Sequence, residues 1–208
     1  NTTGASALPK PYGVDGPIAA YVDSSNTWIY ATMRRGGRVL YAFNVNRSDP
    51  SDITLKWKKG CPNNFPTSGT VSDTNCSSSL DGIGQTWSTP QTFKASGYGT
   101  SPLLIMGGGY DTCEDANPHT CSSSTKGNKV YVMDANTGSL LNTFTTDRGV
   151  IADIVVVPNP NTGLALYAYA VDLGGNIYRI TIGTNTPGNW SMTKIASLGC
   201  DSTASCSL

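Results

Sequence analysis

The chain has 208 residues, and its 14 basic and 14 acidic side chains give a formal net charge of zero. Charged residues make up only 13% of it, about half the usual share for a soluble domain. Little charge together with much Gly, Ser, Thr and Asn favours an all-β protein outside the cell. The neutral balance gives no support to nucleic-acid binding. No apolar run reaches the roughly 18 residues of a membrane-spanning helix, so we expect no membrane insertion either.

The first twelve residues are expected to form a linker. The sequence begins without Met, and its N-terminus lacks the apolar core of a signal peptide. These features predict an interior piece of a longer protein.

Beyond the linker, short runs of β-branched and aromatic residues alternate with turns rich in Gly, Asn, Asp and Pro. Such runs are typical of antiparallel strands joined by hairpins, and no segment shows a sustained helical stripe. The strands fall into three groups of four. We expect them at residues 16–23, 28–35, 39–45 and 55–58, then at 86–94, 102–106, 129–134 and 140–145, and finally at 151–157, 164–171, 177–182 and 190–196.

The three groups repeat one pattern, because the third strand of each carries a Tyr within an apolar run. Repeated four-stranded antiparallel units predict the blades of a β-propeller. Propellers take about four to eight blades, so three blades make a partial propeller. Further blades then lie outside this chain, or something else closes the arc. We assign residues 1–208 to one propeller domain, with blades at 16–60, 85–146 and 150–197, a loop at 61–84, an insertion at 107–128 and a tail at 198–208.

The six cysteines support an oxidising compartment. They fall as close pairs, each within a loop rich in Ser, Thr and Asn: Cys61 with Cys76, Cys113 with Cys121, and Cys200 with Cys206. Sequence cannot settle connectivity, but local pairing is the simplest proposal, since each bond would restrain one long loop. Zinc is the alternative. It is disfavoured because the chain has no C-x-x-C motif and only one histidine.

Several phrases, taken together and in order, resemble a known family. They are YGVDGPIAAY at 12–21, MRRGGRVLYAFNV at 33–45, GQTWSTP at 84–90, LLIMGGGYDTCED at 103–115 and YAVDLGGNIYRI at 169–180. In this order they resemble the C-terminal β-propeller of PilY/PilC-type adhesins, which are associated with the tip of type IV pili. The resemblance implies an extracellular surface protein that supports pilus assembly, counters retraction and mediates attachment. Its expected partners are minor pilins or other pilus subunits and a surface receptor of unknown identity.

The chain departs from that family in one loop. The family often carries a calcium loop of the form D-x-D-x-D-G-x-x-D just before the phrase that matches residues 169–175. The corresponding ligand positions here are Pro158, Pro160, Thr162 and Leu166. None supplies a carboxylate, and calcium needs six to eight oxygen ligands, so we expect no calcium in this loop.

Acidic residues gather in the second insertion, where Asp111, Glu114 and Asp115 stand near His119. They could form a metal or partner site in a disulfide-tied loop. The favoured interpretation is a solvated loop whose Asp and Asn side chains make turns, with His119 as a surface residue. The insertion 107–128 and the loop 61–84 are the candidates for partner contact, because loops on a rigid scaffold usually carry recognition.

Three arginines at one hairpin, Arg34, Arg35 and Arg38, could bind a carboxylate bidentately. The favoured interpretation is that they pack between blades or pair with acids such as Asp15 or Asp23.

Trp57 and Trp87 could be platforms for sugar stacking. As residues of predicted strands, they are expected in the core between blades. Asn1, Asn46, Asn75 and Asn189 begin N-x-S/T triplets, which are expected by chance in such a composition.

Catalysis finds little support in the sequence, which has no G-x-S-x-G motif and no metalloprotease helix. We therefore predict a non-enzymatic adhesin domain without cofactor. The alternatives are a fragment of a quinoprotein-like enzyme, for which no quinone or calcium residues are found, and a purely structural arc that packs on pilus subunits.

Overall fold

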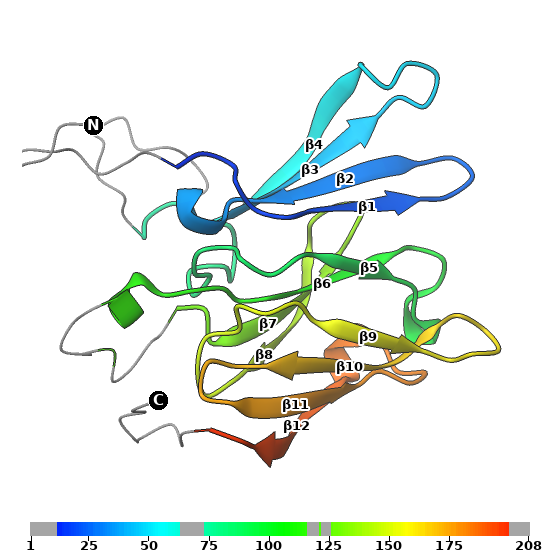
Figure 1. Ribbon diagram of the computed structural model, residues 1–208. Helices are drawn as coiled ribbons and strands as arrows, with labels where there is room; N and C mark the ends of the chain where they lie inside the picture. The colour runs from blue at the N-terminus through cyan, green and yellow to red at the C-terminus, as the bar shows by residue number, and fades with distance from the viewer. Residues whose placement is uncertain (1–11, 63–72, 116–120, 122–125, 200–208) are drawn as a thin grey trace, which may run out of the picture.

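The computed structural model describes residues 12–62, 73–115, 121 and 126–199. Within these residues it contains three four-stranded antiparallel sheets, each with its strands in chain order (Figure 1). The sheets are the first blade, of β1 Ile18–Val22, β2 Thr27–Thr32, β3 Val39–Val45 and β4 Ile53–Gly60; the middle blade, of β5 Gln91–Phe93, β6 Leu103–Gly107, β7 Lys129–Asp134 and β8 Leu140–Thr145; and the last blade, of β9 Val155–Pro158, β10 Ala165–Val171, β11 Asn176–Thr181 and β12 Ser191–Ser197. The predicted all-β fold of four-stranded blades is confirmed.

The blades are arranged radially about their first strands. β1 lies against β5, and β5 lies against β9, so the first strands are neighbours across blades (Figure 1). The third strands β3, β7 and β11 are the tyrosine-bearing segments, as predicted. Short 3-10 helices occupy some connections: η1 Arg34–Gly36, η2 Ser96–Tyr98, η3 Thr112–Asp115 and η4 Pro187–Asn189.

The middle blade is buried on both faces. Because side chains alternate across a strand, Leu103 and Ile105 enter the core shared with the last blade. Leu104 and Met106, from the same strand, enter the core shared with the first blade. A strand covered on both sides needs a continuous apolar run, which explains the uninterrupted sequence Leu103–Gly107 of β6.

Aromatic side chains tie the first blade to the middle one. Tyr30 and Trp57 are buried, and both donate hydrogen bonds to the carbonyl oxygen of Ala135, at 2.9 and 3.3 Å. Trp57 also packs on Gly138, whose φ of +67° places it in the turn after β7. Trp57 therefore lies in the core between blades, as predicted.

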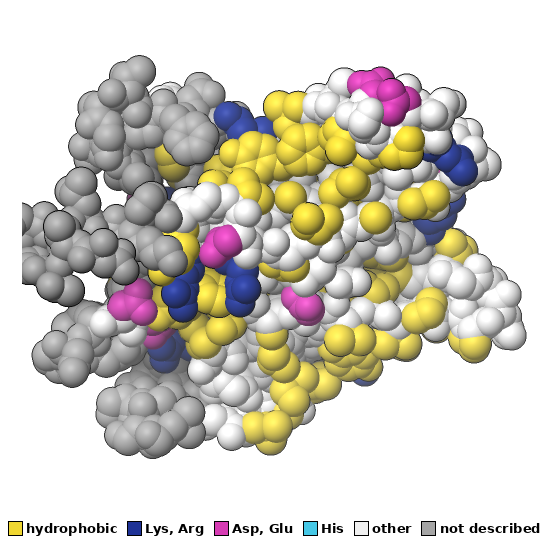
Figure 2. Space-filling view, turned by 45° about the horizontal axis from the view of Figure 1, so that its top comes forward, with side chains coloured by type: hydrophobic (Ala, Val, Ile, Leu, Met, Phe, Trp, Pro, Cys, Tyr) yellow, Lys and Arg dark blue, Asp and Glu magenta, His cyan; other side chains and the backbone are white. Residues whose placement is uncertain are grey.

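The outer faces of the end blades carry exposed hydrophobic side chains. On the first blade, Ile18 and Leu55 are 68% and 58% exposed, and Tyr41 stacks on Phe43 with ring centroids 6.2 Å apart. Figure 2 shows hydrophobic side chains in an interrupted band over this part of the molecule. The last blade likewise exposes Val155 and other apolar side chains of its strands. Each end blade thus has one covered face and one open face.

Several predicted strands are shorter in the structure: the strand expected at 16–23 spans 18–22, and that expected at 28–35 ends at Thr32. Two others differ more. The strand expected at 86–94 is reduced to Gln91–Phe93, and that expected at 151–157 begins only at Val155. Thr86 pairs with the connection around η1 instead: its N–H donates to the Gly37 carbonyl, and its carbonyl accepts from the Arg34 N–H. This crossover to the first blade removes the segment from the middle sheet. No helix among the described residues is long and apolar enough to cross a membrane.

Candidate binding site

Three connecting segments meet at one end of the blades. They are the connection around η1, residues 84–90 and residues 107–115. The backbones of Gln85 and Tyr110 exchange two hydrogen bonds, at 2.8 and 2.9 Å, and the Arg34 N–H donates to the Thr86 carbonyl at 3.0 Å. Segments far apart in sequence therefore form one continuous surface.

Glycine makes this approach possible. Gly109 has a φ of +105°, and a Cβ there would lie 2.1 Å from the Gln85 carbonyl oxygen. Gly36 is similarly crowded, since a Cβ would lie 1.6 Å from the carbonyl oxygen of Gly13. Any larger residue would push these segments apart, so Gly36 and Gly109 are required by the packing.

Trp87 organises two arginines on this surface. The guanidinium carbons of Arg34 and Arg35 lie 4.5 and 5.8 Å from the centroid of its ring, within the range of a cation–π contact. Tyr110 contacts the same indole edge to face, with centroids 6.3 Å apart. Trp87 is half-buried and lies outside any strand, so the prediction that it belongs to the core between blades is wrong. The crossover of residues 86–90 places it at the surface.

A hollow of about 620 Å³ opens beside Trp87. This volume lies within the usual range for small-ligand sites. Its walls are aromatic, apolar and polar side chains: Tyr12, Arg35, Gln85, Trp87, Tyr110, Asp115 and Ile151. We call it the Arg35 hollow.

A second hollow adjoins it and contains Arg38. The Arg38 guanidinium forms an ion pair with Asp73 and donates to the carbonyl of Asp81 at 2.8 Å. Lys126 pairs with the same Asp73 carboxylate at 2.9 Å. Hydrogen bonds from Lys126 and Arg38 lower the pKa of Asp73. Arg38 thus finds its acidic partner in Asp73, and not in the expected Asp15 or Asp23; the Asp23 carboxylate accepts from Tyr21, Ser25 and Asn26.

The acidic residues of the 107–115 segment do not converge. The Asp111 carboxylate accepts from the Cys113 N–H, and Asp115 accepts from the Tyr110 hydroxyl at 2.8 Å. Burial, then the hydrogen bond to Asp115, raises the pKa of Tyr110 to about 12, so its hydroxyl stays protonated. Within the described ranges, no group of three or more His, Cys, Asp or Glu is placed to hold a metal ion. His119 lies outside them.

The prediction of a solvated loop is wrong for Glu114, which is largely buried. Its side chain is only 10% exposed, and both of its carboxylate oxygens lie 2.9 Å from the Arg148 Nη2. Arg148 follows the middle blade, so this ion pair fixes the 107–115 segment to the body of the molecule.

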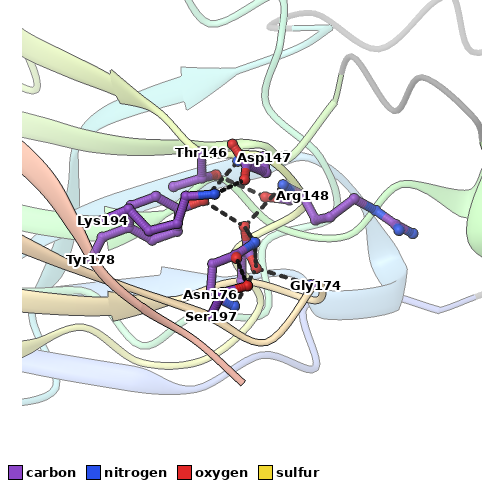
Figure 3. A network of polar contacts seen from close by, with 9 residues as sticks. Thr146, Asp147, Arg148, Gly174, Asn176, Tyr178, Lys194 and Ser197 are labelled. Atoms are coloured by element: carbon purple, nitrogen blue, oxygen red, sulfur yellow. Dashed lines mark hydrogen bonds and ion pairs between the residues drawn. The ribbon is translucent and has the colours of Figure 1, made fainter. Parts of the chain in front are cut away.

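The backbone of Arg148 belongs to a polar network with the last blade (Figure 3). The buried Asp172 carboxylate accepts from the Arg148 N–H at 3.0 Å and from the Tyr178 hydroxyl at 2.9 Å. It also accepts from the backbone and side chain of Asn176. The Tyr178 hydroxyl in turn accepts from the Asp147 N–H at 3.0 Å. Asp172 is therefore a structural acid that joins the middle and last blades.

Two of the predicted disulfides are present. Cys61 bonds to Cys76 and Cys113 to Cys121, which confirms local pairing for both. Cys200 and Cys206 lie outside the described residues.

The loop that departs from the calcium pattern is a tight hairpin between β9 and β10. The Asn159 side-chain oxygen accepts from the N–H groups of Asn161 and Thr162, and the Thr162 hydroxyl accepts from the Leu164 N–H. These oxygens form the turn itself. That the loop takes no calcium remains a prediction.

Together, the radially arranged four-stranded blades define a β-propeller module, with the Arg35 hollow at one end of the blades. A family model described as "PilY1 beta-propeller domain" matches residues 4–200. The chain therefore belongs to the PilY1 β-propeller family.

Individual PilY1 proteins are also similar to this chain. The chain is 28% identical over 169 residues to the "Type IV pilus biogenesis factor PilY1" of Pseudomonas aeruginosa, covering 80% of this chain and 12% of the relative. It is 26% identical over 181 residues to the PilY1 homolog of Xylella fastidiosa, covering 84% and 12%. The crystal structure of the Pseudomonas aeruginosa PilY1 C-terminal domain matches with a TM-score of 0.58 and 19% identity, over 85% of this chain and 34% of that one. The chain thus spans about an eighth of its curated relatives.

Sequence reasoning missed two elements of the site. The Arg148–Glu114 ion pair joins residues 34 positions apart, and no local pattern marks it. The stacking of Arg34 on Trp87 also depends on the crossover. The sequence indicated this contact only indirectly, because Arg34 and Trp87 both lie in segments that resemble the family, at 33–45 and 84–90.

Proposed function

We propose that the chain is a non-enzymatic propeller module of a pilus-associated surface protein, which supports type IV pilus assembly, counters retraction and mediates attachment. The family match over residues 4–200 carries this proposal, together with the names of two relatives as pilus biogenesis factors. The two disulfides support an extracellular location at the pilus tip or cell surface.

The loop end of the blades is the surface we assign to recognition. Four of the sequence phrases that carry the family resemblance, at 12–21, 33–45, 84–90 and 103–115, supply all the walls of the Arg35 hollow except Ile151. The Glu114–Arg148 ion pair and the Asp172 network hold that surface rigid. A preorganised surface loses less conformational entropy on binding. Minor pilins or other pilus subunits, and an attachment receptor, are the proposed partners.

The test uses the full-length protein in the bacterium that makes it. Removing residues 12–199 is expected to reduce surface pili, measured as sheared pilin by immunoblot. Arg35→Glu is expected to leave pili in place and to lower attachment of the cells. Arg47→Glu, at the opposite end of β3, is the matched control. Normal piliation after removal of the domain would contradict the assembly role, and normal attachment of Arg35→Glu would contradict the attachment role.

A structural role without attachment is the second proposal. The open apolar face of the first blade favours it, since Ile18 and Leu55 offer a surface that another protein layer could cover. Binding of purified protein to minor pilins, with attachment unaffected by hollow variants, would favour this role. A quinone absorbance band in the purified protein would instead support the enzymatic alternative.

A further inference from the structure

Two arginines beside the Arg35 hollow carry charge without a carboxylate partner. Arg34 and Arg35 are exposed, and neither forms an ion pair with any described residue. Both are instead held on aromatic rings, Arg34 on Trp87 and Arg35 between Trp87 and Tyr12. Stacking orders a guanidinium while leaving N–H groups on its edge for an acceptor. Arg35 lines the hollow, donates from Nη1 to the Tyr12 hydroxyl at 3.3 Å, and presents its other N–H groups to a ligand.

The backbone at Arg34 is also unusual. Arg34 has a φ of +46°, a left-handed conformation that costs a residue with a Cβ roughly 1–2 kcal/mol. Its N–H is fixed by the Thr86 carbonyl. Such strain concentrates at ligand-binding sites. Here the conformation sets the guanidinium over the indole.

The hollow mixes donors, an acceptor and apolar walls. The charges of Arg35 and Asp115 offset each other, and Arg34, stacked on the same Trp87 ring, adds one positive charge beside the hollow. Asp115, already holding the Tyr110 hydroxyl, repels a highly charged anion but can accept from a hydroxyl group. Trp87 and Ile151 supply an apolar wall on which the C–H face of a sugar ring can pack. These features fit a ligand with one carboxylate and several hydroxyls.

An extended peptide fits less well. Peptides add to exposed strand edges through main-chain hydrogen bonds. At this hollow, the backbones of Gln85 and Tyr110 already satisfy each other, so this stretch offers no open edge. We propose that the Arg35 hollow binds a sugar residue that bears a carboxylate, with Arg35 as the bidentate donor to it and Asp115 as an acceptor of hydroxyl groups. The proposal deepens the attachment role and rests on it for its biological meaning.

Titration calorimetry on the full-length protein tests this binding without pili. The probes are 3′-sialyllactose and trigalacturonate, two sources of the same chemistry, with lactose as the neutral match and triglutamate as the peptide match. At least one acidic sugar is expected to bind about tenfold or more tightly than lactose. Arg35→Gln is expected to weaken it about tenfold, the usual scale for a charge-assisted hydrogen bond. Arg35→Lys keeps the charge but loses the planar guanidinium. Its affinity for the acidic sugar is expected to lie between those of the unaltered protein and Arg35→Gln.

The control Arg47→Gln is expected to bind as the unaltered protein does. Which sugar binds identifies the source of the ligand. Equal binding of lactose, absence of binding by both acidic sugars, or Arg35-dependent binding of triglutamate would each overturn the proposal. A failure of the pilus experiments would leave this binding result intact, so the two can be told apart.

Discussion

The middle blade and the end blades use the same four-stranded meander in different environments. Every residue of β6 is buried, and its alternate side chains contribute to two separate cores. In the first blade, by contrast, Tyr30 is fully buried on one face while Ile18 is 68% exposed on the other. Because each blade is built from four antiparallel strands, we infer that the stability of a blade depends on how many of its faces a neighbouring blade covers. The middle blade is the centre of the described structure.

Truncating a leucine should separate the two environments most strongly. Leu104 is fully buried in β6, and Leu104→Ala is expected to lower the free energy of unfolding by about 2–5 kcal/mol. Leu55→Ala, at a position 58% exposed on the first blade, is expected to stay within about 0.5 kcal/mol. Urea unfolding of both variants measures the contrast. Equal losses would show that another layer covers the outer face of the first blade.

The attachment of the 107–115 segment to the body of the molecule should depend on the Arg148 side chain. Arg148→Met removes the ion pair from the largely buried Glu114 carboxylate, and the free energy of unfolding is expected to fall by about 3 kcal/mol. Adding Glu114→Gln to that variant should recover part of the lost unfolding free energy, because it removes the buried negative charge. Chemical denaturation of the two single variants and the double variant gives the coupling energy. Purely additive losses would contradict a direct pair.

A smaller effect is expected for the turn that follows β7. Burial acts to raise the pKa of Asp134, but hydrogen bonds from Tyr98, Thr137 and Ser101 outweigh it and lower the pKa. A lowered pKa in the folded state adds stability above about pH 4, the ordinary Asp value, and this is lost as the pH falls through the folded pKa. The unaltered protein should therefore lose more unfolding free energy between pH 6 and pH 3 than Asp134→Asn. Equal losses of unfolding free energy in the two proteins would show that the Asp134 carboxylate does not contribute to this pH dependence.

Two buried tyrosines provide the finest test. Tyr30 of the first blade donates its hydroxyl to the Ala135 carbonyl, whereas the buried Tyr131 hydroxyl of the middle blade has no hydrogen-bond partner among the described residues. Tyr30→Phe is expected to cost about 1 kcal/mol, and Tyr131→Phe to be neutral or slightly stabilising. Thermal and urea unfolding can compare them. A clear loss for Tyr131→Phe would reveal a bound water or another partner.

Strand positions were predictable because they follow local rules. Alternating and continuous apolar runs, with Gly and Asn at the turns, located the third strand of each blade, including that of Tyr131. The site was less accessible, because it depends on contacts between distant segments. Pro90 cannot donate a hydrogen bond, and Thr86 pairs with the first blade, so Trp87 leaves its predicted strand. No sequence pattern announces that crossover, nor the partner of Glu114.

We expect the middle blade, covered on both faces, to be the most stable part of the described chain. Native-state hydrogen exchange, followed by mass spectrometry, measures this blade by blade. Amides of β6 and β7 are expected to exchange last, well after those of β1 and β12. Equal protection of the strands of the end blades would contradict the conclusion that coverage on both faces makes the middle blade the most stable.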